Sequence, residues 1–397
     1  MDNQLKWIIN TNKAKDTATR SAIVSEEIGQ EVIAFHRSFE EYHKTSLHQL
    51  SHLAEHLGVG QIYLKDESTR FGLNSFKVLG ASYAIGKTLA QLLNRPISET
   101  PFAYLLKEET KEQLAHVKLV ATTDGNHGRG VAWTAQKLGL EAQIYMPKGT
   151  TQNRLEHIAK LGAKVEMTDY NYDETIRMML DKSKGTQNQI IQDTAWEGYE
   201  EIPTWIMQGY STIAQEIIED LEEALPTHIF LQAGVGAFAG VMSDMMLRHY
   251  KENAPKIIIV EAQNSECFYK SIENHKMSAV TGDLKTIMAG LACGEPNPVA
   301  WEILKEACDA VIVAQDSVSA RGMRILGNPI VSDPQIISGE CGGVTLGVLS
   351  LIAKEESYAA LKEALAINED SHIVLVSTEG DTDPQMYRDI VWKGAYS

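Results

Sequence analysis

The sequence predicts an α/β fold with two parallel-sheet domains, the smaller one inserted in the larger. Short apolar segments alternate with longer amphipathic ones along most of the chain, the pattern of strands separated by helices. Helices of about ten or more residues between successive strands indicate parallel pairing, with helices on both faces of each sheet. A chain of 397 residues exceeds one typical core, so two domains are expected.

The individual elements follow from this alternation. The predicted strands are residues 61–64, 118–121, 143–146, 164–167, 189–192, 228–231, 256–260, 310–314 and 372–376. The predicted helices are residues 76–93, 125–138, 152–161, 173–181, 205–223, 237–250, 317–326 and 342–354. Residues 1 to about 45 have few apolar clusters and are expected to form an arm or covering segment. The polar stretch 93–113, with two prolines, predicts a surface excursion.

The domain boundaries come from the same reading. The larger domain is expected to comprise residues 1–77 and 204–397, and the smaller domain residues 78–203. We expect the active site in the cleft between them, where small-molecule sites usually lie.

Composition excludes several classes of partner. A net charge of −17 argues against nucleic acid and against an anionic membrane surface, because like charges repel. The weakly polar stretch 342–353 is too short to span a bilayer, and the N-terminus lacks a secretory signal pattern. The four cysteines show no C-x-x-C spacing, so no metal site is predicted. The expected location is the cytoplasm, with reduced thiols.

A lysine stands at the start of the first long apolar helix. Lys77 follows Asn74-Ser75-Phe76, where the positive end of the helix dipole disfavours a charged ammonium. A lysine with a lowered pKa is more often neutral, and its neutral amine attacks aldehydes. Lys77 is therefore a candidate for a Schiff base with a carbonyl cofactor. The alternative is an ordinary surface lysine, because most lysines are exposed.

A second motif, TTDGNHG at residues 122–128, follows an apolar strand and opens a helix. Its backbone amides and hydroxyl groups could bind an anion. Asp124 could equally be a helix N-cap, and Asn126 a plain turn residue.

A glycine loop follows the strand predicted at residues 228–231. Gly234 and Gly236 would let the backbone approach a phosphate closely. With Glu261 at the end of the next strand, the loop also suits a dinucleotide site, in which the acid binds a ribose. The spacing G-x-G-x-x-x-G departs from that motif. A nicotinamide-dependent oxidoreductase is therefore the alternative from another class of enzyme.

The fourth motif is STEGD at residues 377–381, after the last predicted strand. The hydroxyl of Ser377 could bond a ring nitrogen, or the segment could be an ordinary turn. All four motifs lie at the carboxyl ends of predicted strands, where ligands bind in open α/β sheets.

The four motifs occur in this order in the fold-type II pyridoxal-phosphate enzymes, which include threonine and serine dehydratases, cysteine synthase and the tryptophan synthase β-subunit. A closer resemblance runs from about residue 42 to the end, and is to the diaminopropionate ammonia-lyases. The segments that carry it are FGLNSFK at 71–77, TDGNHGRGVAW at 123–133, QDTAWEGY at 192–199 and GLACGEPNP at 290–298.

The resemblance implies a cofactor and roles for single residues. Lys77 would carry pyridoxal 5′-phosphate covalently and act as the base at Cα. Phe76 would contact the cofactor, Asn126 its 3′-oxygen, and Ser377 its pyridine nitrogen. The phosphate would lie against Ala233, Gly234, Val235 and Gly236. The implied substrate contacts are Thr123, Asp124, Gly125, His127 and Asp193, of which Asp124 and Asp193 are also candidate catalytic residues.

The implied activity is elimination of ammonia from 2,3-diaminopropionate through aminoacrylate, giving pyruvate and two ammonia, in a homodimer. Dehydratases usually have a small hydroxyl residue where Asp124 stands. A carboxylate there would repel that of a hydroxy amino acid by roughly 4 kcal/mol at ~4 Å and an effective dielectric of 20. The β-ammonium of diaminopropionate would offset that repulsion. A serine or threonine dehydratase is the alternative activity.

Asp193 is the second candidate carboxylate. It stands in a segment rich in aromatic residues, and a helix N-cap is its alternative role.

Two further hypotheses concern stereochemistry and redox state. A single lysine reaches the Cα proton of one enantiomer only, so we expect Asp124 to serve the other enantiomer as a second base. Both D- and L-diaminopropionate would then be substrates. Cys267 and Cys293 follow apolar segments near the predicted loops, and a bond between them is a weaker expectation.

Overall fold

The computed structural model describes residues 4–13, 23–123 and 125–397, and these divide into two compact units. The first unit comprises Met1–Ile23, Lys44–Thr69 and Ile213–Ser397. The second unit comprises Val24–His43 and Arg70–Thr212. The domain boundaries expected from the sequence stay a prediction.

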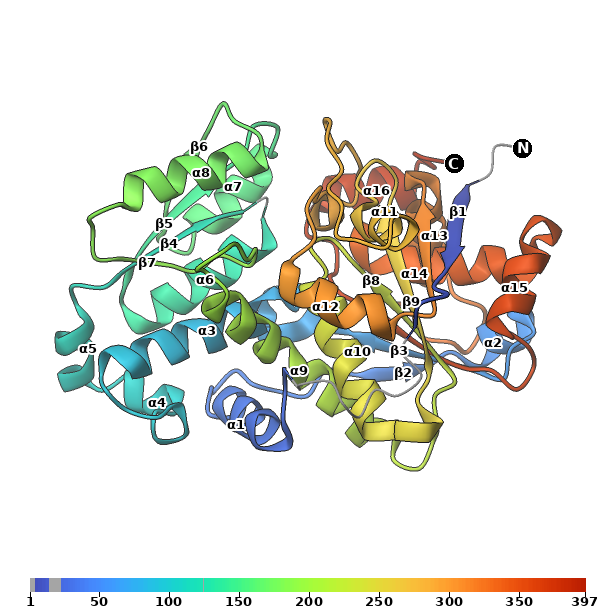
Figure 1. The fold of residues 1–397 in the computed structure, drawn as a ribbon, viewed down its shortest axis with the longest axis horizontal. Coiled ribbons are helices and arrows are strands. Elements are labelled where there is room, and N and C mark those ends of the chain that lie inside the picture. Colours follow the sequence, from blue (N-terminus) through green and yellow to red (C-terminus); the bar gives the residue numbers. More distant parts are fainter. Residues whose placement is uncertain (1–3, 14–22, 124) are drawn as a thin grey trace. The chain divides into compact units, whose positions relative to one another are not determined.

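The first unit is built on a seven-stranded sheet in the order β1-β10-β9-β8-β11-β3-β2 (Figure 1). Its strands are β1 (Leu5–Ile9), β2 (Leu47–Gln49), β3 (Gln61–Asp66), β8 (His228–Gln232), β9 (Lys256–Ala262), β10 (Ala310–Ala314) and β11 (His372–Ser377). The five inner strands run parallel, and β1 and β2 pair antiparallel at the two edges. Isoleucines 257–259 of β9 are fully buried, as expected of a parallel strand covered on both faces.

Helices cover this sheet, and helix and strand residues together form the first unit's core. They are α2 (Ser51–Leu57), α10 (Ala237–Tyr250), α11 (Cys267–Glu273), α12 (Pro298–Ala307), α13 (Asp316–Gly327), α14 (Glu340–Lys354), α15 (Ala359–Leu365) and α16 (Pro384–Val391). Helices α13 and α14 approach so closely that a Cβ on Gly322 would lie 1.8 Å from the carbonyl oxygen of Gly343. The glycines therefore set how these two helices pack.

The second unit is built on a four-stranded parallel sheet in the order β6-β5-β4-β7. Its strands are β4 (Lys118–Thr122), β5 (Glu141–Met146), β6 (Lys164–Met167) and β7 (Asn188–Ile190). Its helices are α1 (Glu26–Arg37), α3 (Lys77–Leu92), α4 (Phe102–Leu105), α5 (Glu108–Leu114), α6 (Asn126–Leu138), α7 (Gln152–Ala159) and α8 (Tyr172–Ser183). The helix α9 (Glu201–Leu221) begins in this unit and ends in the first.

Helices pack on both faces of the smaller sheet. Gly128 of α6 packs against Ile144 of β5, whereas Met179 of α8 shares a core with Tyr145. Successive strand residues point to opposite faces, so α6 and α8 lie on opposite sides of this sheet. The α/β class with parallel sheets, predicted from the alternation, is confirmed.

The expectation of an arm over residues 1–45 is wrong for two segments. Residues 5–9 form the edge strand β1, and residues 26–37 form the helix α1, which Ser25 caps. In β1 only Leu5 is fully buried, because an edge strand covers little surface. The stretch 93–113, predicted as a surface excursion, includes the short helix α4 and most of α5.

Candidate functional site

The predicted site residues fall into two sets, one in each unit. The second unit holds Phe76, Lys77, Thr123, Gly125, Asn126, His127 and Asp193, and the first unit holds residues 233–236 and Ser377. Asp124 lies outside the residues that the structure describes.

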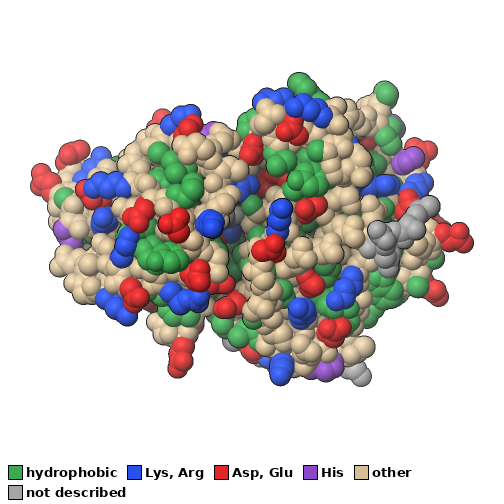
Figure 2. All heavy atoms as spheres, turned by 90° about the horizontal axis from the view of Figure 1, so that it is seen from above, with side chains coloured by type: hydrophobic (Ala, Val, Ile, Leu, Met, Phe, Trp, Pro, Cys, Tyr) green, Lys and Arg blue, Asp and Glu red, His purple; other side chains and the backbone are tan. Residues whose placement is uncertain are grey.

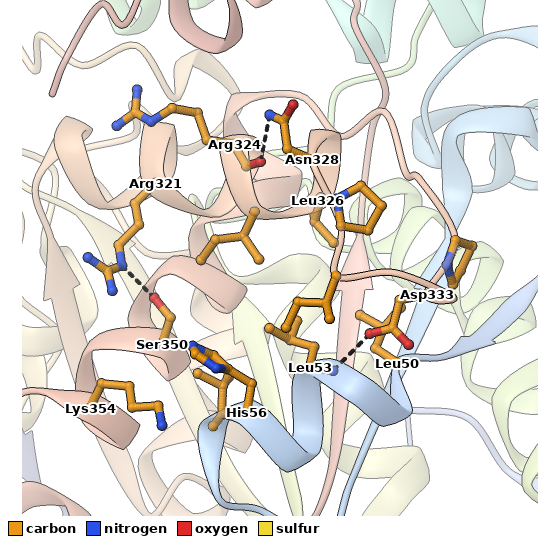
Figure 3. A pocket seen from close by; sticks show the side chains of 15 residues that line it. Leu50, Leu53, His56, Arg321, Arg324, Leu326, Asn328, Asp333, Ser350 and Lys354 are labelled. Atoms are coloured by element: carbon orange, nitrogen blue, oxygen red, sulfur yellow. Dashed lines mark hydrogen bonds between the residues drawn. The ribbon is translucent and has the colours of Figure 1, made fainter.

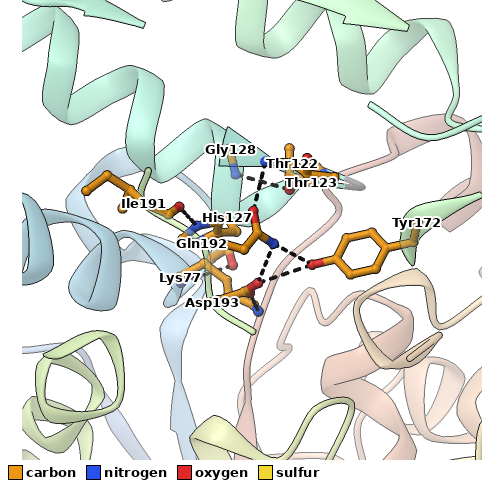
Figure 4. A network of polar contacts seen from close by, with 11 residues as sticks. Lys77, Thr122, Thr123, His127, Gly128, Tyr172, Ile191, Gln192 and Asp193 are labelled. Carbon is orange, nitrogen blue, oxygen red and sulfur yellow. Dashed lines mark hydrogen bonds and ion pairs between the residues drawn. The ribbon is translucent and has the colours of Figure 1, made fainter. Parts of the chain in front are cut away.

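Lys77 is the first residue of α3, as the sequence predicts, and it forms an ion pair. Its Nζ lies 2.8 Å from Oδ2 of Asp193 (Figure 4). The Asp193 side chain is 8% exposed and that of Lys77 is 20% exposed. The two residues stand 116 positions apart in the chain. Folding therefore places the Schiff-base candidate against a buried carboxylate.

Two further side chains hold the Asp193 carboxylate. The Tyr172 hydroxyl, 3.2 Å away, donates to Oδ1, and Nε2 of Gln192 lies 3.3 Å from the same atom. Burial alone would raise the pKa of Asp193, but Lys77, His127 and Tyr172 outweigh it and hold the pKa below its usual range. Asp193 is therefore ionised at neutral pH.

Gln192 connects this carboxylate to the sheet. Its Oε1 accepts the backbone N–H of Thr122 at 2.9 Å, at the end of β4. Its Nε2 also donates to the Tyr172 hydroxyl at 2.9 Å. Both the oxygen and the nitrogen of the Gln192 side-chain amide thus form hydrogen bonds, and these fix the orientation of Tyr172 and Asp193 (Figure 4).

The N-cap interpretation of Asp193 is wrong. The residues after it form bends and a short bridge between Trp196 and Tyr199, and the next helix begins only at Glu201. The carboxylate is used in the ion pair with Lys77 instead.

The loop at residues 123–128 is held by Thr123 and His127. The Thr123 hydroxyl oxygen accepts the N–H groups of Gly125 at 3.0 Å and Gly128 at 3.1 Å. The buried His127 ring donates through Nε2 to the carbonyl of Ile191 at 2.7 Å, next to the segment that carries Asp193. Asn126 opens α6, whose N-cap is Gly125, and the Thr123 hydroxyl takes up one amide of the first turn, that of Gly128. The loop therefore presents a helix N-terminus, which favours anions.

In the first unit, the glycine loop joins β8 to α10 and is formed by backbone. Gly236 is the N-cap of α10 with φ +90°, and no side chain caps the helix. A Cβ on Gly236 would lie 2.3 Å from the Phe268 ring, and one on Gly234 would lie 2.8 Å from the carbonyl of Gly290. Residues 234–236 thus bring the backbone to the N-terminus of α10, the kind of place where an anion such as phosphate binds.

Ser377 is the last residue of β11 and is fully buried. Its hydroxyl donates to the Ser338 hydroxyl oxygen at 2.8 Å. Gln232, at the end of β8, donates to the carbonyl of Val376 at 2.7 Å, so the glycine loop and Ser377 share one edge of the sheet. A buried hydroxyl and a backbone anion cradle fit the pyridine nitrogen and the phosphate of a pyridoxal cofactor.

All four cysteines are free thiols, so the alternative to reduced thiols, a Cys267–Cys293 bond, is not present in the structure. Both nevertheless lie beside Gly234. The Cys267 thiol contacts the carbonyl of Gly234 at 3.8 Å, and Cys293 Sγ lies 3.3 Å from the position of a Cβ there. Burial raises the pKa of Cys267, so this thiol is protonated and weakly reactive.

Glu261 does not act as the ribose ligand that a dinucleotide site needs. It is fully buried, and it accepts the N–H groups of Phe268 at 2.8 Å and Tyr269 at 2.7 Å at the start of α11. Burial raises its pKa to about 8. Because its two oxygens already bind this helix, the oxidoreductase alternative loses its acidic residue.

Sequence reasoning missed Tyr172 and treated Gln192 only as part of a motif. Tyr172 comes from the first turn of α8, in a segment with no catalytic pattern. The sequence feature that could have indicated these contacts is the position of Gln192 directly before Asp193.

Acidic and basic side chains are interspersed on the face in Figure 2. Among the described residues, no helix combines the length and apolar character needed to cross a bilayer. In the same part of the chain, no group of three or more histidine, cysteine or acidic side chains is placed to hold a metal ion.

Comparison with known proteins agrees with this geometry. Residues 39–379 match the family described as pyridoxal-phosphate dependent enzyme. The chain is 46% identical to the diaminopropionate ammonia-lyase of Salmonella typhimurium, covering 99% of each chain. It is 27% identical to a catabolic L-threonine dehydratase of Staphylococcus aureus over 71% of this chain and 72% of the relative.

Solved structures agree as well. The holo diaminopropionate ammonia-lyase of Escherichia coli superposes with a TM-score of 0.92 at 44% identity, covering 99% of this chain and 98% of the other. The same enzyme has been solved with an aminoacrylate-PLP azomethine reaction intermediate (TM-score 0.91, 44% identity, the same coverage). The match over the full length, together with the lysine at the start of α3 and the backbone cradle at the start of α10, shows that this chain belongs to the pyridoxal-phosphate-dependent enzymes and, among them, to the diaminopropionate ammonia-lyase family.

Proposed function

We propose that this protein eliminates ammonia from 2,3-diaminopropionate. The Cα proton and the β-amino group leave, giving aminoacrylate and one ammonia. Aminoacrylate then takes up water to give pyruvate and a second ammonia. The full-length likeness to diaminopropionate ammonia-lyases at 46% identity supports this substrate.

Lys77 is the proposed attachment residue and the proposed base at Cα. Bound pyridoxal phosphate supplies an electron sink that stabilises negative charge at Cα. The Lys77 amine would accept the Cα proton of one enantiomer. Asp124 is the proposed base for the other enantiomer, so both D- and L-diaminopropionate are proposed substrates.

The Lys77–Asp193 pair is the observation that carries the proposal. If Lys77 held the cofactor, its ammonium would no longer be available to pair with the buried Asp193 carboxylate. An ammonium of the substrate supplies that missing charge. Diaminopropionate has a β-ammonium, whereas serine and threonine have a neutral hydroxyl. Asp193, assisted by Tyr172, is therefore the proposed ligand of the β-amino group.

The remaining predicted residues bind the rest of the cofactor and substrate. We propose that residues 233–236 bind the phosphate and that Ser377 bonds the pyridine nitrogen. Phe76 and Asn126 are proposed to contact the cofactor, and Thr123, Gly125 and His127 to shape the pocket for the substrate carboxylate. His127 acts through its bond to Ile191.

A substrate panel tests the activity. Purified protein is assayed for pyruvate release from both enantiomers of 2,3-diaminopropionate and of serine, and for 2-oxobutyrate release from L-threonine. Diaminopropionate should have the highest kcat/KM. A higher value for serine or threonine would favour the dehydratase alternative and would leave the cofactor assignment intact.

We further propose that the protein is a homodimer of the cytoplasm. Four free thiols are typical of a reducing compartment. Sedimentation of the purified holoenzyme at several concentrations tests the dimer, and fractionation of the native cell tests the location.

A further inference from the structure

We infer that the cavity formed by α2, α13, α14 and the loop after α13 binds a small carboxylate with an apolar body. The cavity lies wholly within the first unit and has a volume of about 770 Å³, within the range of small-molecule pockets. It shares no lining residue with the proposed cofactor and substrate set.

The floor and walls of the cavity are apolar (Figure 3). The apolar lining residues are Leu50, Leu53, Leu57, Ile325, Leu326, Pro329, Ile330 and Pro334. Such a surface takes a hydrocarbon chain or ring rather than a free inorganic anion.

The polar part of the lining is mainly basic. His56, Arg321, Arg324 and Lys354 line the cavity, against the single acid Asp333. The whole protein has a net charge of −17, so this concentration of positive charge departs from the average of the surface. An anionic ligand group complements it.

The one acid does not neutralise these cations. Both oxygens of Asp333 are engaged at the start of α2. Oδ1 accepts the N–H of His52 at 3.2 Å, and Oδ2 accepts the N–H of Leu53 at 2.8 Å. The Asp333 carboxylate therefore compensates the α2 N-terminus.

Arg321 and Lys354 have no acidic partner in the part of the chain that the structure describes. Nε of Arg321 donates to the Ser350 hydroxyl at 2.8 Å, which anchors the guanidinium on α14 (Figure 3). The terminal nitrogens of this guanidinium form no hydrogen bond with the described residues, so they match the two oxygens of a carboxylate.

Arg324 adds to the positive field. Arg324 stands one turn after Arg321 on α13, and burial and then the charge of Arg321 lower the pKa of Arg324. Arg324 donates to the backbone carbonyls of Ile390 and Ala395 at 3.3 and 3.1 Å. Like charges so arranged, without an anion, are costly, and a bound carboxylate relieves that cost.

Octanoate is a suitable probe, and calorimetric titration of the holoenzyme measures its binding. 1-Octanol has a chain of the same length without the charge, and butyrate has the charge with a short chain. Octanoate should bind, and both comparison compounds should bind at least tenfold more weakly. Octanol binding as tightly as octanoate would overturn the proposal, and so would an absence of octanoate binding.

Lys354→Gln gives the sharpest variant, because Lys354 is exposed and its ammonium contacts no described side chain. It should weaken octanoate binding several-fold, and Arg321→Gln together with Lys354→Gln should weaken it tenfold or more. The matched control Lys276→Gln removes an exposed lysine of the same unit that does not line the cavity. Equal losses in Lys354→Gln and Lys276→Gln would contradict a local site.

A second copy of the chain could instead cover this face. Ile330, which is 38% exposed, and Val331 beside the cavity would then be interface residues. If Ile330→Asp dissociates the holoenzyme in sedimentation and octanoate binds only to the dissociated form, the face is an interface and the carboxylate site is disproved. Unchanged assembly with weakened octanoate binding in the same variant supports the site.

Discussion

The two units hold their predicted site residues by different means. In the second unit the contacts are between charged and polar side chains, with Lys77 on Asp193 and Asp193 on Tyr172 and Gln192. In the first unit the loop 234–236 offers backbone groups, and its glycines leave no room for a Cβ. A site made of side chains can be changed one charge at a time without disturbing the fold. A site made of backbone is sensitive to any added atom, whatever its charge.

The largest loss of activity should come from substitution of Lys77, in the second unit. Lys77→Arg keeps a cation opposite Asp193 but cannot form the covalent bond or accept the Cα proton. We expect kcat to fall by about 10⁴-fold, the upper end for loss of a general base. Thermal unfolding should change little, because the ion pair is retained.

Borohydride reduction and peptide mapping complete this experiment. The label should sit on Lys77 in the wild type and be absent from Lys77→Arg. Lys87→Arg is the matched control, since Lys87 lies on the same helix and pairs with Glu31 at 3.6 Å. A label on Lys65 or Lys87 would overturn the assignment of the attachment site.

The second effect concerns the two enantiomers. Asp124→Asn keeps the shape of the side chain but removes its basic oxygen. Turnover of D-diaminopropionate should fall far more than that of the L-enantiomer, by roughly 10²–10⁴-fold. Equal losses would mean that Asp124 only binds the substrate. A wild type inactive on the D-form would refute the second base.

The third prediction separates charge from shape at Asp193. Asp193→Asn retains an acceptor for the Tyr172 hydroxyl but loses the negative charge that faces Lys77. We expect kcat/KM for diaminopropionate to fall by roughly 10²-fold, in line with removal of one partner of a buried charge pair. The value for serine should fall less, because serine has no β-ammonium. An equal fall for both substrates would assign Asp193 to the positioning of Lys77 alone.

The sequence predicts regular elements better than it predicts pairs of residues. The apolar run at 310–314 and the amphipathic segment 237–250 match β10 and α10 in full, since burial and helical periodicity are local signals. The edge strand β1 was not predicted, although its sequence LKWII is mostly apolar, and only Leu5 of it is buried. The class of fold follows from the local signals alone.

The site shows the same limit. Lys77 was found because a lysine at a helix start is a local pattern. Its partner stands 116 positions away, and an Asp before a polar turn fits a cap equally well. Tyr172 projects from the first turn of α8, where only the packed sheet determines that it meets Asp193. Such contacts are determined by the tertiary structure, and no pattern in the neighbouring sequence predicts them.

The smallest change in function should come from a substitution in the glycine loop of the first unit. Two glycine variants, one in this loop and one elsewhere, separate the effect of overpacking from that of backbone strain. Gly236→Ala adds a Cβ 2.3 Å from the Phe268 ring at φ +90°, whereas Gly58→Ala has a similar backbone strain at φ +73° and no atom within 4 Å. Gly58→Ala should lose about 1–2 kcal/mol of unfolding free energy from the left-handed conformation alone. Gly236→Ala should lose about 1–3 kcal/mol more from overpacking, measured by urea unfolding of the apo-protein. Its affinity for pyridoxal phosphate should also fall about tenfold, because the first amides of α10 must shift, while Gly58→Ala keeps the wild-type affinity. If both variants bind the cofactor equally well, the loop at 234–236 does not form the phosphate cradle, and the contrast between the two units fails on the backbone side.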